Sequence, residues 1–219
     1  MSGSQSHSKR PRLRFGLRTL LAIFLLTSVL TAWCANEKRA AESQHRDVAA
    51  IVGAGGLVWY DYEFDKSKQF NETRPEPRLR RWLRRTLGDD YFRKVHSIDF
   101  NNPDEEMMAR IANLKTLKRL WVVGERVDDN SVGQLNGLNQ LEWLSLDATN
   151  VSDKGMERLK DLPNLRVLSL SNTQVSDHGM EHIRQLTGLQ GVYLCNTNVS
   201  ALGFQAIRNA LSNCKVVGP

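Results

Sequence analysis

Apolar residues recur every 24 positions through the second half of this 219-residue chain. A period of about 20 to 29 residues predicts a stack of similar units, because one unit of that size cannot bury its apolar face alone. Three of the columns that keep this register contain Leu117, Leu141, Leu165 and Leu189; then Leu120, Leu144, Leu168 and Val192; then Val122, Leu146, Leu170 and Leu194.

Each unit combines a strand pattern with a helix pattern. In the unit at 141–164, Leu144 and Leu146 alternate inward on a short strand, and Ser152 and Asp153 cap the helix that follows. Stacked units therefore predict a parallel sheet on one side, helices on the other and a continuous apolar interior between them. The helix contributes to that interior Met156, Leu159 and Leu162.

The unit L-x-x-L-x-L-x-x-T-x-V-S-D-x-G resembles the leucine-rich repeat, which implies an α/β fold, a right-handed solenoid with a parallel sheet. The repeats span residues 95–217, and a shortened first unit places Ile98 and Phe100 in the Leu120 and Val122 columns. At the turn after each strand, such families often carry Asn, whereas this chain has Thr. We expect the hydroxyls of these threonines to form a hydrogen-bonded ladder. These hydroxyls belong to Thr149, Thr173 and Thr197.

Residues 36–94 lie outside the repeat and predict a helix/strand/helix cap for the open end of the solenoid. Residues 37–52 suit a helix, residues 57–64 a strand, and residues 77–87 a second helix with an Arg-rich face. The arrangement over residues 10–217 is similar to a group of bacterial membrane-anchored leucine-rich repeat proteins. The residues that match are Gly55, Gly56, Val58, Tyr60, Asp61, Trp82, Leu83, Leu87, Gly88, Asp89, Asp90 and Phe92.

Residues 19–35 form a stretch without charge, just long enough to cross a bilayer as one transmembrane helix, a signal-anchor. A cleaved signal peptide and a lipoprotein signal ending at Cys34 are the alternatives. Trp33 disfavours both, because signal peptidase and the lipobox require small side chains near the cut.

The positive charge of the chain is concentrated before this stretch. Of the formal net charge of +6, residues 1–18 carry five cations and no acidic residue, which predicts a basic cytoplasmic tail by the positive-inside rule. The repeat domain is then extracytoplasmic, on a single-pass cell-membrane protein. The remaining residues are almost neutral, so no nucleic acid is expected as a partner.

No motif predicts a catalytic, cofactor-binding or metal site, so we expect a chain that is not an enzyme. His178 and His182 stand four apart, but they occupy the columns of Lys154 and Arg158, which are simply solvated positions in the preceding unit. The glycines at 53–56 follow a helix and precede a strand, the reverse of the order in a dinucleotide-binding loop.

Outward strand positions predict a protein-binding surface on the concave face of the sheet. If Leu120 and Val122 point inward, their neighbours point to solvent, and aromatic residues there are typical of protein interfaces. An alternative is that the N-terminal segment or a second copy covers these side chains. The predicted partner-binding residues are Asp99, Arg119, Trp121, Trp143, Ser145, Ser169 and Tyr193.

The sequence therefore favours a non-catalytic, membrane-anchored module that binds a protein partner on its concave sheet. One alternative is a substrate-recognition adaptor for another enzyme, since the repeats are similar to those of F-box proteins, although no F-box-like helical domain is visible. A hydrolase is the weaker alternative, because the concave face lacks paired carboxylates or a nucleophile with its base.

The charge asymmetry around residues 19–35 makes a testable prediction of orientation. A reporter enzyme that is active only outside the cytoplasm, fused after Pro219, should be active in intact cells. A reporter that is active only in the cytoplasm should be inactive at the same position, and the reverse pattern would contradict the orientation.

Overall fold

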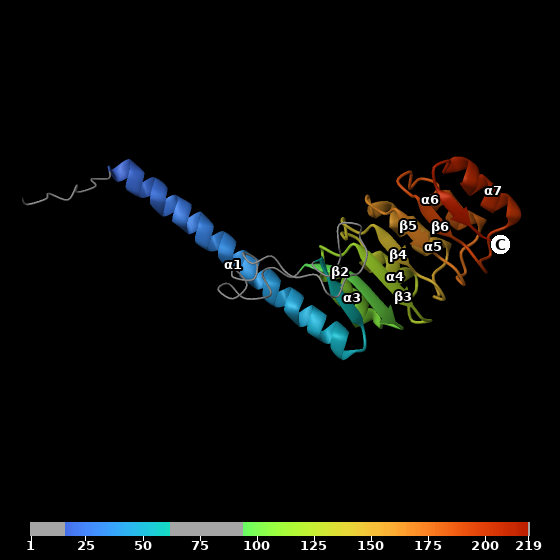
Figure 1. Cartoon of the computed structure of the whole chain (residues 1–219), viewed down its shortest axis with the longest axis horizontal. Helices are drawn as coiled ribbons and strands as arrows, with labels where there is room; N and C mark the ends of the chain where they lie inside the picture. Colours follow the sequence, from blue (N-terminus) through green and yellow to red (C-terminus); the bar gives the residue numbers. More distant parts are fainter. Residues whose placement is uncertain (1–15, 62–93, 219) are drawn as a thin grey trace, which may run out of the picture. The chain divides into compact units, whose positions relative to one another are not determined.

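A computed structural model describes residues 16–61 and 94–218 of the chain (Figure 1). The chain divides into two compact units, residues 1–40 and 41–219. The basic tail up to residue 15 and the expected second cap helix at 77–87 lie outside the described residues.

The described part of the first unit is helical. Helix α1 extends from Leu17 to Gly53 without a break, so it contains both the expected membrane segment and the expected first helix of the cap. It includes an 18-residue window long and apolar enough to cross a membrane, and none of that window is buried. A signal sequence near the N-terminus would meet the same criteria.

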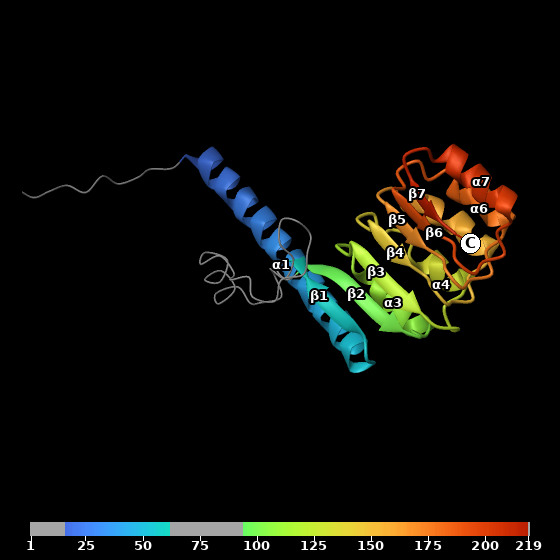
Figure 2. The ribbon, with the colours of Figure 1, turned by 45° about the vertical axis from the view of Figure 1, so that its right-hand side comes forward.

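The second unit is built on one seven-stranded sheet whose strands follow the order of the chain (Figure 2). Strand β1 pairs antiparallel with β2, and every later neighbour is parallel. The strands are β1 (Leu57–Tyr60), β2 (Val95–Asn101), β3 (Arg119–Val123), β4 (Trp143–Ser145), β5 (Val167–Ser169), β6 (Gly191–Tyr193) and β7 (Lys215–Val217).

Short helices connect the parallel strands and cover one face of the sheet (Figure 2). Each helix contacts the helix of the next repeat, so the helices form a second layer that follows the strand order. They are α3 (Glu105–Asn113), α4 (Asp129–Gln134), α5 (Asp153–Arg158) with the 3-10 turn η3 (Leu159–Asp161), α6 (Asp177–Ile183) and α7 (Ala201–Ala210).

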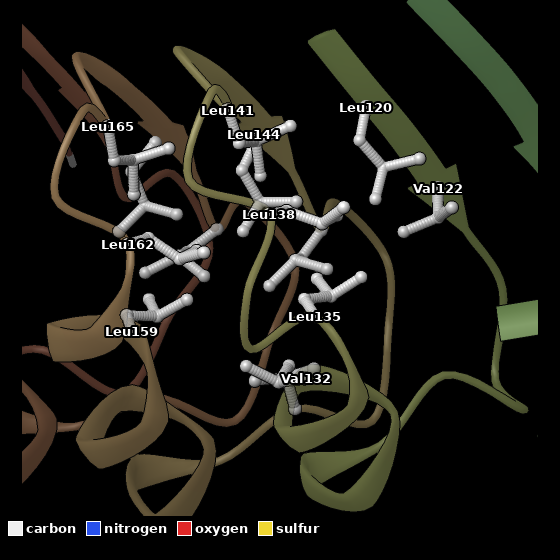
Figure 3. Packing of buried hydrophobic residues seen from close by; sticks show 14 of the residues in the cluster. Leu120, Val122, Val132, Leu135, Leu138, Leu141, Leu144, Leu159, Leu162 and Leu165 are labelled. Atoms are coloured by element: carbon white, nitrogen blue, oxygen red, sulfur yellow. The ribbon is translucent and has the colours of Figure 1, made fainter. Parts of the chain in front are cut away.

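The core lies between these layers and consists of the repeated apolar columns (Figure 3). Leu120, Leu144 and Leu168 are paired side by side on β3, β4 and β5, and all three are fully buried. Ile98 and Phe100 pair with Leu120 and Val122, which confirms the shortened first unit. With its parallel sheet, its helical layer and its single repeated core, the fold is an α/β leucine-rich repeat solenoid, as the sequence predicts.

The last turns of α1 cover the first repeat. Val48 and Ile51 belong to the same hydrophobic cluster as the repeat leucines. Asp47, also buried, lies 3.2 Å from Nη1 of Arg110 and accepts a hydrogen bond from Asn113 on α3. The apolar end of the repeat stack therefore has a helical cap, joined to α3 by an ion pair that satisfies the buried carboxylate.

The expected threonine ladder between repeats is wrong. Thr149 and Thr173 are buried, and each donates its hydroxyl to a carbonyl of its own repeat, three residues earlier, at 2.6 Å. The threonine side chain is short, and its hydroxyl reaches the carbonyl of the residue that follows its own strand, Leu146 or Leu170. One bond across repeats at this turn comes from the preceding column, where Asn196 Nδ2 donates to Asn172 Oδ1 at 3.0 Å.

The S-D-x-G signature supplies a polar ladder on the helical side. Asp153 accepts two hydrogen bonds from Ser176 of the next repeat, 2.7 Å from the backbone nitrogen and 2.6 Å from the hydroxyl. Asp129 binds Ser152 in the same way, and Asp177 binds Ser200. The hydroxyl of Ser152 therefore links two repeats, and it makes no capping hydrogen bond to its own helix.

This ladder explains the glycine of the signature. A Cβ atom on Gly179 would lie 2.5 Å from Oδ1 of Asp153, an oxygen already held by Ser176. Gly155 and Gly203 face Asp129 and Asp177 in the same arrangement. The column therefore requires glycine for close approach, although glycine is otherwise unfavourable in a helix.

Two glycine substitutions should have opposite effects on stability. Gly179→Ala should lower the free energy of unfolding by about 1–3 kcal/mol, because the added methyl displaces the Asp153 carboxylate. Gly133→Ala should raise it by about 0.5–1 kcal/mol, since this helical glycine has open space where a Cβ would lie. Chemical denaturation of both variants tests the pair, and equal effects would contradict the packing role of the column.

Candidate functional site

The register of the sheet arranges its outward side chains in two rows. Paired residues on neighbouring strands share a face, so each row contains one residue from every strand. The first row is Trp59, Ser97, Arg119, Trp143, Val167, Gly191 and Lys215; the second is Leu57, Asp99, Trp121, Ser145, Ser169, Tyr193 and Val217.

Large outward side chains on β1 to β4 surround a cavity of about 350 Å³. We call it the tryptophan hollow. Its lining includes Trp59, Ser97, Asp99, Arg119, Trp121 and Trp143. Four of the seven predicted partner-binding residues thus lie around one cavity, namely Asp99, Arg119, Trp121 and Trp143.

The tryptophans of the hollow differ in burial and in their contacts within the protein. Trp121 is 50% exposed, whereas Trp143 is half-buried. The guanidinium carbon of Arg119 lies 4.6 Å from the centroid of the Trp143 ring, which is cation–π geometry. The Trp143 ring therefore has an internal partner, while half of the Trp121 side chain is left in water.

Asp99 is a half-buried residue of the second row, on β2 beside Trp121. Among the described residues, no hydrogen bond or ion pair reaches its carboxylate. Burial raises the pKa of Asp99 above its ordinary value, and the positive charge of Arg119 opposes that rise without cancelling it. The hollow therefore contains a carboxylate whose charged form is less well stabilised than in water.

Three predicted residues lie outside the hollow. Ser145 is 2% exposed and Ser169 is 8% exposed, and both donate hydroxyl hydrogen bonds to Asp147, at 2.9 and 2.6 Å. The backbone nitrogen of Ser171 donates to the same carboxylate at 2.7 Å. Tyr193 is half-buried on β6, two strands beyond β4. This part of the face is therefore tied together by its own hydrogen bonds.

Trp59 belongs to the hollow but is absent from the set predicted from the sequence. Its strand lies outside the repeat, so the repeat register does not indicate its face. The antiparallel pairing of Trp59 with Ser97 brings it into the first row. Alternation within β1 separates Leu57 and Trp59 from Val58 and Tyr60, and the latter two pack on the core. The alternation of apolar residues along β1 is therefore the sequence signal that indicates the outward face for Trp59.

No protein-family model matches the chain, and no curated protein matches it either. Among solved structures, it is similar to internalin C2 of Listeria monocytogenes, with 21% identity over 51% of this chain and 55% of that chain and a TM-score of 0.38. A second internalin of the same organism has 20% identity over 50% of this chain and 36% of that chain, with a TM-score of 0.35.

A leucine-rich repeat protein of Leptospira interrogans is also similar, with 19% identity over 49% of this chain and 38% of that chain and a TM-score of 0.27. The chain thus spans about half of the first internalin and about a third of the second. The assignment of the fold rests on the register and the core of the chain itself.

Replacing Asp99 tests the electrostatics of the hollow. A carboxyl group whose pKa is raised on folding makes the protein less stable as the pH rises through the interval between its unfolded and folded pKa values. Asp99→Asn should therefore raise the melting temperature at pH 7. The gain should shrink as the pH falls toward about 4 and be nearly absent below it, where the carboxyl is largely protonated in both states.

The matched control for this prediction is Asp161→Asn, an exposed position on the helical side, which should leave the melting temperature nearly unchanged. A lower melting temperature of Asp99→Asn at pH 7 would instead mean that the carboxylate has a stabilising partner.

Proposed function

We propose that this chain is a non-catalytic protein-interaction module that binds a polypeptide partner on the outward face of its sheet, centred on the tryptophan hollow. The observation that carries the proposal is Trp121, an indole that is 50% exposed on a rigid strand. Tryptophan and arginine are enriched among the residues that dominate binding energy at protein interfaces. A fixed strand also presents them at little entropic cost on binding.

The proposed surface extends from the hollow along the second row. Trp121, Trp143, Arg119 and Asp99 form its centre, where a partner side chain finds a cavity. Ser145 and Ser169 form the floor beside it, and a partner would reach them through the Asp147 carboxylate to which both are bonded. Tyr193 lies at the far end of the row.

The proposal includes attachment to a membrane through residues 19–35, with the N-terminus cytoplasmic and the repeats extracytoplasmic. Large apolar side chains along this part of α1, such as Phe24, Leu26 and Val29, are about two-thirds exposed, and the charge before the helix is strongly positive. A membrane would bury these side chains. The module would then display its sheet at the cell surface or in the adjoining compartment.

Substitution of Trp121 tests the proposed surface. The full-length protein in detergent micelles is used to capture proteins from its native cells, which are identified by quantitative mass spectrometry. Trp121→Ala should weaken the binding free energy of a specific partner by about 2 kcal/mol or more, because a central interface tryptophan is lost. The recovery of that partner should fall accordingly. Its melting temperature should remain close to that of the wild type, since an exposed side chain contributes little to folding.

Leu202→Ala is the control, since Leu202 is an apolar side chain that is 78% exposed on α7, away from the outward face. It should retain the partner that Trp121→Ala loses. If both variants recover the same proteins in the same amounts, the partner does not bind at the hollow.

A further inference from the structure

The tryptophan hollow combines two features that point to one kind of ligand. One is the Asp99 carboxylate, half-buried and without a hydrogen bond or ion pair from any described residue. The other is the set of indole rings in the same lining, of which Trp121 is the most exposed. We propose that the hollow receives a basic side chain of the partner, a guanidinium or an ammonium group, with Asp99 as its carboxylate and the Trp121 ring as its wall.

The chemistry of both features favours a cation. A carboxylate that is partly removed from water without a partner carries a desolvation cost, and a cation that donates hydrogen bonds to it offsets that cost. The face of an indole ring is electrostatically negative and attracts cations, most of all when water is excluded. An anion would gain from neither group, because both present negative potential.

Arg119 is the group that opposes this assignment, since its positive charge faces Asp99 and lines the same hollow. Its guanidinium, however, already lies over the Trp143 ring at 4.6 Å. Asp99 has no equivalent partner, and the effect of burial on its carboxyl exceeds the effect of Arg119. The unmet electrostatic requirement of the hollow is therefore for positive charge beside Asp99.

The hollow is large enough to receive a long side chain. A cavity of about 350 Å³ is at the small end of the range for ligand pockets. It opens on the outward face of the sheet, where a polypeptide laid across the strands can insert a single long residue. This inference rests on the proposed function, because it supplies the chemistry of the partner residue at the centre of the same surface.

Small probes test the charge requirement directly. The full-length protein in detergent micelles, labelled with ¹⁵N at its five tryptophans, is titrated with N-acetylarginine amide, with N-acetylcitrulline amide and with N-acetylglutamate amide. Citrulline has nearly the shape of arginine without its charge. We expect arginine to shift the indole signals of Trp121 and Trp143 and to bind at least about tenfold more tightly than citrulline.

Two variants, with one control variant, separate the roles of Asp99 and Arg119. Asp99→Asn should lower the affinity for the arginine probe by about tenfold or more, whereas Asp161→Asn should leave it unchanged. Arg119→Gln should raise the affinity, because it removes the opposing charge. All three variants are compared at equal folded fraction, checked by their melting temperatures.

Each other outcome overturns the inference. Equal binding of arginine and citrulline would make the hollow an uncharged apolar pocket. Preferred binding of the glutamate probe, lost in Arg119→Gln, would make it an anion site. If no probe binds while Trp121→Ala still loses the partner, the proposed function stands and the basic residue is wrong. If arginine binds but Trp121→Ala retains the partner, the proposed surface fails and, with it, the assignment of the cation to a partner.

Discussion

Each repeat of this protein can bury its leucines only against the next repeat, and this requirement fixes the inward side of the whole sheet. Leu120, Leu144 and Leu168 are fully buried because they lie side by side on adjacent strands. A shift of one residue in any strand would exchange its inward and outward side chains. The register therefore determines which residues are available for binding as firmly as it determines the core.

That constraint is the reason that much of the fold can be predicted from the sequence. Columns spaced by 24 residues identify the strands, their parallel order and the two faces, and even the shortened first unit falls into register through Ile98. The same alternation correctly separates the hollow residues Asp99, Arg119, Trp121 and Trp143 from the core. Trp59 was missed because its strand precedes the first repeat, where the period carries no information.

Polar contacts were harder to predict, because they depend on which acceptor a short side chain reaches first. A threonine column suggests a ladder between repeats, yet each hydroxyl finds a carbonyl within its own turn. The ladder that exists joins Asp153 to Ser176 and its equivalents. Its sequence signal is the glycine three residues after each ladder serine, at 155, 179 and 203. A helix disfavours glycine unless another group occupies the space of its Cβ.

Two carboxylates near the outward face, Asp147 and Asp99, differ in whether they find hydrogen-bond donors within the protein. At the end of β4 and on β5, Asp147 accepts hydrogen bonds from Ser145, Ser169 and Ser171. The remaining outward residues of β5 and β6 are Val167, Gly191 and Tyr193. The Asp147 carboxylate is therefore stabilised by donors within the protein.

Two outward residues of β2 and β3 lack such internal contacts. Among the described residues no group donates a hydrogen bond to Asp99, and Trp121 is 50% exposed. Neither residue belongs to the buried core. Burial raises the pKa of Asp99, because it disfavours the charged form of the carboxyl. Groups that are unfavourable for the isolated fold become favourable only when a ligand supplies what they lack. The proposed binding surface therefore lies where an outward carboxylate, that of Asp99, has no hydrogen-bond donor among the described residues.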